Sequence, residues 1–186
     1  MLIHVTGASG SGTSTLGAAL AAELDGTHFD ADDYYWLPTS PPFTQKRAAP
    51  DRLSLLLADL RAKEVSVLAG SVVGWGPELE DSFDLIVFLY LDAAIRLERL
   101  RKREIERLGH ADPEFLEWAA RYDEGPPVGR SLAKHQAWLG ARSCPIIEIH
   151  GDLTVAERVA TVLGAAPNPS FKRTRSGRLR RPPRSA

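Results

Sequence analysis

Hydrophobic residues along this chain form short runs that alternate with segments in which they recur every three or four positions. The longest run, Leu85 to Leu91, is uninterrupted, as is typical of a strand buried on both faces of a parallel sheet. Four shorter segments are further candidates for strands. They cover residues 2–6, 27–30, 65–69 and 145–149. Strands that alternate with helical segments indicate an α/β fold with a parallel sheet.

Helices are predicted between these strands, from spacings that place hydrophobic residues on one face. After the first strand, Leu16, Leu20 and Leu24 share such a face. Further helices are predicted over residues 53–60, 92–108, 112–122, 129–141 and 154–163. The helix that starts at Asp112 has an N-cap residue followed by a proline, which favours a helix start. Residues 31–50 are rich in proline and aromatic residues and predict a loop.

The loop between the first strand and the first helix contains a glycine-rich motif. Residues 7–14 read GASGSGTS, which matches the phosphate-binding pattern G-x-x-x-x-G-K-[ST] except that Thr13 replaces the lysine. Such a loop directs backbone N–H groups at an anion, and the helix N-terminus adds partial positive charge. The residues expected to bind nucleotide phosphates are Gly7, Ala8, Ser9, Gly10, Ser11, Gly12, Thr13, Ser14 and Thr15. Because phosphoryl transfer normally uses the lysine charge, another cation is expected to replace it.

Composition limits the class of protein. The chain has 186 residues, of which 44% are hydrophobic and 25% charged, and this balance fits one globular domain over residues 1–166. No hydrophobic run is long enough to cross a membrane, and the first residues carry no basic segment, so a cytoplasmic location is expected. Residues 167–186 contain seven basic residues and no acid, which predicts a disordered tail. Such a tail could bind nucleic acid, although a solvated extension is the favoured interpretation.

The order of strand, glycine loop and helix, with the elements that follow, resembles the nucleoside-monophosphate kinase group, which includes adenylate, cytidylate and shikimate kinases. The resemblance covers residues 1–164 and implies a three-layer P-loop NTPase fold with five parallel strands in the order 2-3-1-4-5. It also implies a helical insertion at 31–64 that closes over the phosphoryl acceptor, and a lid at 104–130 that closes over ATP. Archaeal-type cytidylate kinases carry a similar loop with threonine at the lysine position, which implies that Thr13 is compatible with activity.

Two carboxylates follow the second predicted strand. Asp30 and Asp32 are one residue apart, so on the end of a strand they would point to the same side, with Asp33 directed away. They resemble the D-x-D of shikimate-type kinases. Asp30 with Ser14 would then hold Mg²⁺, and Asp32 would orient an acceptor hydroxyl or take its proton. A turn that uses aspartate for local hydrogen bonds is the alternative.

Arginines in the second half of the chain are candidates for phosphate contacts. Arg99 and Arg103 lie at i, i+4 on one face of the helix after the fourth strand. They match arginines that contact adenine and phosphates in adenylate-kinase-like enzymes. Arg121 and Arg130 occupy positions where the lids of this group carry phosphate-binding arginines. One of these two, or Lys134, would replace the missing lysine charge.

Other residues are assigned to the acceptor pocket or to the surface. Arg47 is expected to bind an acidic group of the acceptor. Gly70 and Ser71 stand where adenylate kinases have Asp-Gly and shikimate kinases a glycine cluster, and are assigned to acceptor binding. Arg96 is assigned to the exposed face of an amphipathic helix, and His135 to the surface or to packing.

These features predict an enzyme that uses Mg²⁺ and transfers the γ-phosphoryl group of ATP to a nucleoside monophosphate or a small hydroxylated metabolite. Catalysis is assigned to Asp32, Arg99, Arg103, Arg121 and Arg130. Two alternatives stand beside this hypothesis: an ATP-binding regulatory protein without turnover, and a nucleic-acid-stimulated ATPase that uses the basic tail. The protein is expected to act as a monomer without a membrane partner.

Overall fold

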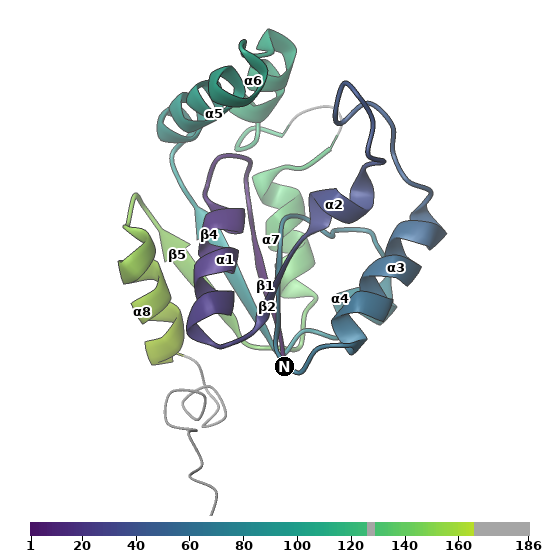
Figure 1. Ribbon diagram of the computed structural model, residues 1–186. Coiled ribbons are helices and arrows are strands. Elements are labelled where there is room, and N and C mark those ends of the chain that lie inside the picture. The colour runs from purple at the N-terminus through teal and green to yellow at the C-terminus, as the bar shows by residue number, and fades with distance from the viewer. Residues whose placement is uncertain (126–128, 166–186) are drawn as a thin grey trace, which may run out of the picture.

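A computed structural model describes residues 1–125 and 129–165, which form a central sheet with helices on both faces (Figure 1). The sheet is parallel and has five strands in the order β2-β3-β1-β4-β5, which confirms the predicted fold class. The strands are β1 Leu2–Gly7, β2 Thr27–Asp30, β3 Ser66–Ala69, β4 Leu85–Tyr90 and β5 Ile146–His150. At the centre, Val5 of β1 lies opposite Ala69 of β3 and Val87 of β4. The predicted tail at 167–186 lies outside the described residues.

Eight helices lie within the described part of the chain. They are α1 Thr13–Glu23, α2 Ala31–Tyr35, α3 Ala49–Arg61, α4 Pro77–Glu80, α5 Ala93–Leu108, α6 Pro113–Ala120, α7 Leu132–Gly140 and α8 Val155–Ala165. Asp112 caps α6 as predicted, because its carboxylate accepts from the backbone N–H groups of Glu114 and Phe115. Helices α2 and α4 were not expected, since four or five residues are too few to show a helical spacing. No helix among the described residues is long and apolar enough to span a membrane.

The sheet separates two hydrophobic clusters. On one face, Leu20 of α1 and Val162 of α8 belong to the cluster that contains Val87 of β4. On the other face, Leu56 of α3 and residues of α4 and α7 pack in the cluster that contains Ile86. Neighbouring residues of β4 therefore face opposite helical layers, as the alternation of side chains along a strand requires. Because β4 is buried on both faces, its sequence is an uninterrupted hydrophobic run.

Arg96 corrects an expectation from the sequence. Instead of lying on the exposed face of α5, its side chain is fully buried where α6 packs against α5. Its guanidinium donates to the carbonyl oxygens of Leu91 and Ala119, at 2.9 and 3.1 Å, and pairs with Asp123 at 3.2 Å. These contacts satisfy the buried charge, so Arg96 fixes α6 and the segment after it onto α5.

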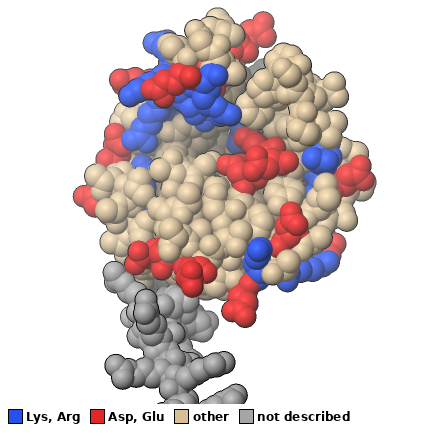
Figure 2. Space-filling model, in the orientation of Figure 1, with Lys and Arg blue, Asp and Glu red and all other residues tan. Residues whose placement is uncertain are grey.

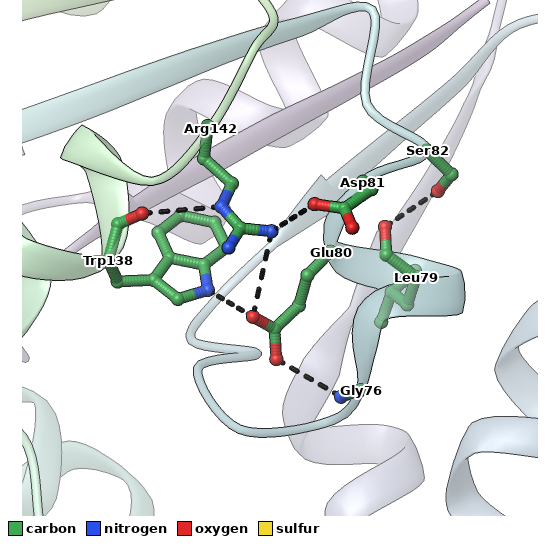
Figure 3. Close-up of polar contacts among 7 residues, drawn as sticks. All are labelled: Gly76, Leu79, Glu80, Asp81, Ser82, Trp138 and Arg142. Atoms are coloured by element: carbon green, nitrogen blue, oxygen red, sulfur yellow. Dashed lines mark hydrogen bonds and ion pairs between the residues drawn. The ribbon is translucent and has the colours of Figure 1, made fainter.

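A second polar group is buried between α4 and α7 (Figure 3). One carboxylate oxygen of Glu80 accepts from Trp138 Nε1 at 2.5 Å, and the other accepts from the backbone N–H of Gly76 at 3.0 Å. Arg142 lies 3.8 Å from Glu80 and pairs with Asp81 at 2.5 Å. The network thereby joins the glycine-rich segment after β3 to α7.

Candidate functional site

The loop between β1 and α1 has a backbone that favours glycine. Gly10 and Gly12 have φ angles of 83° and 95°, in the left-handed region that other residues rarely adopt. At Gly7 the restriction is space, because a Cβ atom would lie 2.4 Å from the carbonyl oxygen of Leu89 and 2.8 Å from Ser11 Oγ. The glycines of the motif therefore permit a tight loop directly after the central strand.

The N-terminus of α1 follows this loop and lies at the edge of a cleft. The helix begins at Thr13, and Gly12 before it has no side chain to cap the first N–H groups. Such N–H groups carry partial positive charge and bind anions. Thr13, Ser14 and Thr15 line the cleft. This geometry fits a phosphate group, although Thr13 contributes no formal charge.

The cleft has a volume of about 760 Å³ and lies between the glycine loop, α5 and the loop that joins β5 to α8. Arg99, Arg103 and Arg107 line it from α5, and Asp152 and Leu153 line it from the loop after β5. Figure 2 shows basic side chains gathered over α5 and acidic side chains near α2, on opposite sides of a hollow. The volume is typical of a site for a small molecule of nucleotide size.

Arg99 and Arg103, which were predicted to share one face of α5, both line the cleft. Arg99 pairs with Asp152 and so connects α5 with the loop after β5. Arg103 pairs with Glu104 at 3.2 Å. Both guanidinium groups are accessible to solvent, where ion pairs contribute little. Each is therefore free to exchange its carboxylate partner for the phosphate oxygens of a ligand.

The hydroxyl of Ser14 donates to Asp30 Oδ2 at 2.5 Å, so the structure brings together the two residues assigned to Mg²⁺. The other oxygen of Asp30 accepts from the backbone N–H of Asp32 at 3.0 Å and caps α2. The expectation that Asp30 and Asp32 share the end of a strand is therefore wrong, because the chain turns into α2 after Asp30. The capping turn still holds Asp32 next to Asp30.

Asp32 lies among charges of both signs. Loss of hydration raises the pKa of its carboxyl group although the residue stays accessible, and the neighbouring Asp30 raises this pKa further. Arg130 and Arg103 act in the opposite direction by stabilising the carboxylate. An aspartate whose pKa is raised is a stronger base than an ordinary one. Asp32 therefore has the chemistry of a proton acceptor.

Of the two arginines assigned to the lid, only Arg130 reaches the glycine loop. Its Nη2 donates to Ser9 Oγ at 3.2 Å, and its guanidinium lies over the ring of Trp118, 5.5 Å from the centroid. Arg121 pairs instead with Glu117 at 3.0 Å on the exposed surface of α6. The structure does not bring Arg121 to the cleft, because it lies at the exposed C-terminal end of α6.

Lys134, the third candidate for the missing charge, also remains outside the cleft. Its Nζ donates to the carbonyl oxygen of Gly129 at 2.8 Å at the start of α7. The side chain is thus used locally and lies exposed on the helix.

The sequence interpretation missed Arg158, which reaches the glycine loop from α8. Its Nη1 donates to the carbonyl oxygen of Ser11 at 2.8 Å, and its Nη2 donates to that of Gly151 at 3.3 Å. A signal was present in the sequence, because Arg158 directly precedes the hydrophobic Val159 within the helix predicted over residues 154–163. A charged residue beside an inward face is a candidate for a buried role.

The acceptor residues expected from the sequence lie around the end of β2. A Cβ atom at Gly70 would lie 2.9 Å from that of Ala31 and 3.6 Å from Asp30 Oδ1, so Gly70 permits the close approach of β3 to α2. The hydroxyl of Ser71 lies 3.4 Å from Nε2 of His135. Arg47 is half-buried and donates from Nε to the carbonyl oxygen of Tyr34 at 3.1 Å.

Aromatic residues near α2 are packed rather than free. The guanidinium of Arg52 lies over the rings of Tyr35 and Trp75, 4.8 and 4.7 Å from their centroids. Trp75 is buried in the core cluster beneath α3, so its ring is not available to stack on a ligand. His135 is also buried and accepts or donates a hydrogen bond with the Tyr122 hydroxyl at 2.7 Å, in agreement with its assignment to packing.

Comparison with known proteins identifies the family. The AAA domain family matches residues 3–115, which include the glycine loop, Asp30 and Asp32. The chain belongs to the AAA domain family. Within known sequences it is 48% identical over 171 residues to an uncharacterized protein, YqaC, of Bacillus subtilis, covering 87% of this chain and 94% of that protein. It is 29% identical over 142 residues to a probable gluconokinase of Xenopus tropicalis, covering 62% of this chain and 74% of that protein.

Solved structures share the fold of this AAA domain. A deoxyadenosine kinase from M. mycoides with bound dATP has a TM-score of 0.57 at 16% identity, over 88% of this chain and 98% of that one. A gluconokinase from Sinorhizobium meliloti 1021 has a TM-score of 0.52 at 21% identity, over 92% of this chain and 96% of that one. At these identities the likeness establishes the arrangement of strands and helices. The fold is therefore shared with these two kinases.

The AAA domain offers groups that suit a nucleotide and a divalent cation. The glycine loop leaves no room for side chains at Gly7, and the first turn of α1 presents N–H groups beside it. The Ser14 hydroxyl and the Asp30 carboxylate are oxygen donors of the kind that Mg²⁺ prefers. Arginines line the cleft on the far side. These residues fit a nucleotide with its Mg²⁺.

Proposed function

We propose that this protein is a kinase that transfers the γ-phosphoryl group of ATP to a hydroxyl group of a small molecule. The observation that carries the proposal is the contact between Ser14 and Asp30 at the glycine loop, with Asp32 held beside it. A hydroxyl from the first turn of α1 and a carboxylate from β2 are the ligands that a nucleotide-bound Mg²⁺ requires. The kinases named among its relatives and structural neighbours support the same reaction class.

The nucleotide is assigned to the cleft beside α5. The backbone N–H groups from Gly7 to Thr15 would bind the phosphates, and Ser14 with Asp30 would hold the Mg²⁺, which neutralises phosphate charge when bound. Arg99 and Arg103 would contact the nucleotide from α5. Arginine is suited to these contacts because its planar group binds phosphate oxygens in pairs.

Acceptor activation is assigned to Asp32. Its raised pKa makes the carboxylate a stronger proton acceptor for a hydroxyl group that enters beside α2. Arg130, which contacts Ser9 of the loop and stabilises the Asp32 carboxylate, would stabilise the charge that develops between donor and acceptor. Its positive charge would compensate for part of the charge that Thr13 does not supply.

The acidic group near α2 favours a hydroxylated metabolite over a nucleoside monophosphate. Asp30 caps α2 and Asp32 and Asp33 lie in its first turn, and each raises the cost of placing a phosphate beside them. A neutral hydroxyl has no such cost and gains a hydrogen bond to Asp32. A nucleoside monophosphate is the second candidate, with Arg47 as the residue that would bind its phosphate.

The proposal is tested by measuring ADP release from MgATP with sugars, hydroxy acids, nucleosides and nucleoside monophosphates. One acceptor class should stimulate release, and Asp32→Asn should abolish the stimulation. Asp33→Asn is the matched control, since it removes a neighbouring exposed carboxylate of α2. ATP binding without stimulation by any class would favour a regulatory protein, and equal loss in both variants would exclude a specific role for Asp32.

A further inference from the structure

Arg158 of α8 is a buried cation that contacts the glycine loop beside Gly12. Only 4% of the residue is exposed, and it lines the same cleft as Gly12, Thr13 and Ser14. A Cβ atom at Gly12 would lie 3.0 Å from Arg158 Nη1, so the guanidinium lies directly against the step from Gly12 into α1. This is the step at which the lysine of the usual motif is replaced by Thr13.

The charge of Arg158 is only partly balanced by the protein around it. Asp152 is the nearby acid, and it pairs with Arg99 instead. Within the described ranges, Arg158 has no ion-pair partner and its buried Nε has no hydrogen-bond partner. Burial lowers the pKa of Arg158, and the neighbouring Arg99 lowers it further, whereas Asp152 acts in the opposite direction. A buried cation beside a second cation is costly unless an anion completes the site.

We infer that Arg158 is a positioning residue for the nucleotide phosphates and that it supplies, from α8, part of the positive charge that Thr13 does not. The inference rests on the proposed function, because it needs a phosphate chain at the glycine loop. The two hydrogen bonds of Arg158 hold the carbonyl oxygens of Ser11 and Gly151, so one side chain links the loop to the other wall of the cleft. The guanidinium therefore holds the glycine loop in place and lies close to the phosphates that the loop would bind.

The residue at position 13 then determines how strongly phosphate binding depends on Arg158. With threonine at position 13, the buried cation on α8 lies against the step at which the lysine of the usual motif would stand. A lysine at position 13 would serve the phosphates directly and make the charge on α8 less important. This reciprocity separates a role in phosphate binding from simple support of the fold, because support by Arg158 would be needed equally with either residue at position 13.

The test is a double-mutant cycle on the full chain, with ADP affinity measured by calorimetry for wild type, Arg158→Gln, Thr13→Lys and the double variant. Arg158→Gln should weaken ADP binding by about tenfold or more, because a charged hydrogen-bond donor near the phosphates is lost. In the Thr13→Lys background the same change should cost about threefold or less. Arg158→Lys, which keeps the charge, should retain intermediate affinity even where the glutamine variant fails to fold. Arg101→Gln, an exposed change on α5, should bind ADP as wild type does.

Two results would overturn the inference. The first is an equal loss of affinity from Arg158→Gln in both backgrounds, which would mean that Arg158 only supports the fold. The second is wild-type ADP affinity in a folded Arg158→Gln protein, which would leave the proposed kinase reaction intact and remove this residue from it. A wild-type protein that binds neither ADP nor ATP would overturn the proposed function and the inference together.

Discussion

The guanidinium of Arg107 lies over the ring of Phe43, 5.5 Å from its centroid. Arg107 belongs to the last turn of α5 and lines the nucleotide cleft, whereas Phe43 belongs to the segment between β2 and α3. A backbone bridge between Trp36 and Lys46 shapes this segment into a hairpin. The contact therefore joins the side of the cleft assigned to ATP to the side assigned to the acceptor.

Removal of this contact should loosen the cleft without unfolding the protein. Phe43 is 42% exposed, so Phe43→Ala should change the melting temperature little. An exposed cation–π contact contributes about 0.5–1 kcal/mol, so KM for the acceptor should rise by about two- to fivefold. Steady-state kinetics with Leu55→Ala, an exposed change on α3, provide the comparison. Indistinguishable KM values for the two variants would show that the hairpin contact has no part in binding.

The two arginines assigned to the lid should differ in effect. Arg130 contacts Ser9 of the glycine loop, whereas Arg121 pairs with Glu117 on the surface of α6. Arg130→Met should lower kcat by about 100-fold, as is usual for loss of a group that stabilises charge in the transition state. Arg121→Met should lower it by about twofold at most. A large loss of kcat in Arg121→Met would mean that α6 moves over the cleft during turnover.

Substitution of Asp32 by asparagine should raise the stability of the protein and lower its activity. Because its pKa is raised in the folded protein, ionising this group costs more there than in the unfolded chain. The cost is absent well below the ordinary pKa of aspartate, grows as the pH rises from that value to the raised folded value, and is constant above it. Asp32→Asn should therefore unfold at a higher denaturant concentration than wild type near pH 7.

The same substitution should lower kcat by about 100-fold or more, since a general base is lost. Wild-type kcat/KM should fall as the pH is lowered through the raised pKa of Asp32, and the residual activity of Asp32→Asn should not follow this profile. Asp33→Asn should keep the wild-type profile. A variant at position 32 that is less stable than wild type near pH 7 would contradict the assignment of a raised pKa.

The fold was predictable because its signals are local. Strands buried on both faces read as uninterrupted hydrophobic runs, and the glycine motif marks the junction of β1 and α1. The turn after Asp30 was not predictable in the same way, since a carboxylate at a strand end serves equally as an extended residue or as a helix cap. In the structure Asp30 caps α2, and Asp32 therefore lies on a helix instead of a strand.

The arginines of the site were only partly predictable, for a related reason. Arg99 and Arg103 follow from the spacing on one long helix. Arg158 is 147 residues from Ser11 in the sequence, and only the packing of α8 beside α1 brings the two together. Arg121 and Arg130 looked equivalent in the sequence because both lie near short helices whose orientation no local pattern defines. Long-range packing thus decides which cation reaches the loop.

A buried histidine should make the stability of this fold depend on pH. His4 of β1 is fully buried, stacks on Phe83 with ring centroids 4.6 Å apart, and lies with Nδ1 3.1 Å from the carbonyl oxygen of Leu68. Burial lowers the pKa of His4 from 6.5 to about 3. Between these two values the unfolded chain binds a proton that the folded protein does not. The free energy of unfolding that neutral His4 contributes is therefore fully present above pH 6.5 and is lost as the pH falls toward 3.

Urea unfolding at several pH values between about 5 and 7 tests this expectation. One such histidine contributes a slope of up to about 1.4 kcal/mol per pH unit to the free energy of unfolding. His4→Phe keeps a ring beside Phe83 but removes the titrating group, so its free energy of unfolding should fall less steeply on acidification. His110→Phe, at an exposed position, is the control. An unchanged slope in His4→Phe would assign the pH dependence to other groups, such as His135, whose pKa burial lowers to about 4.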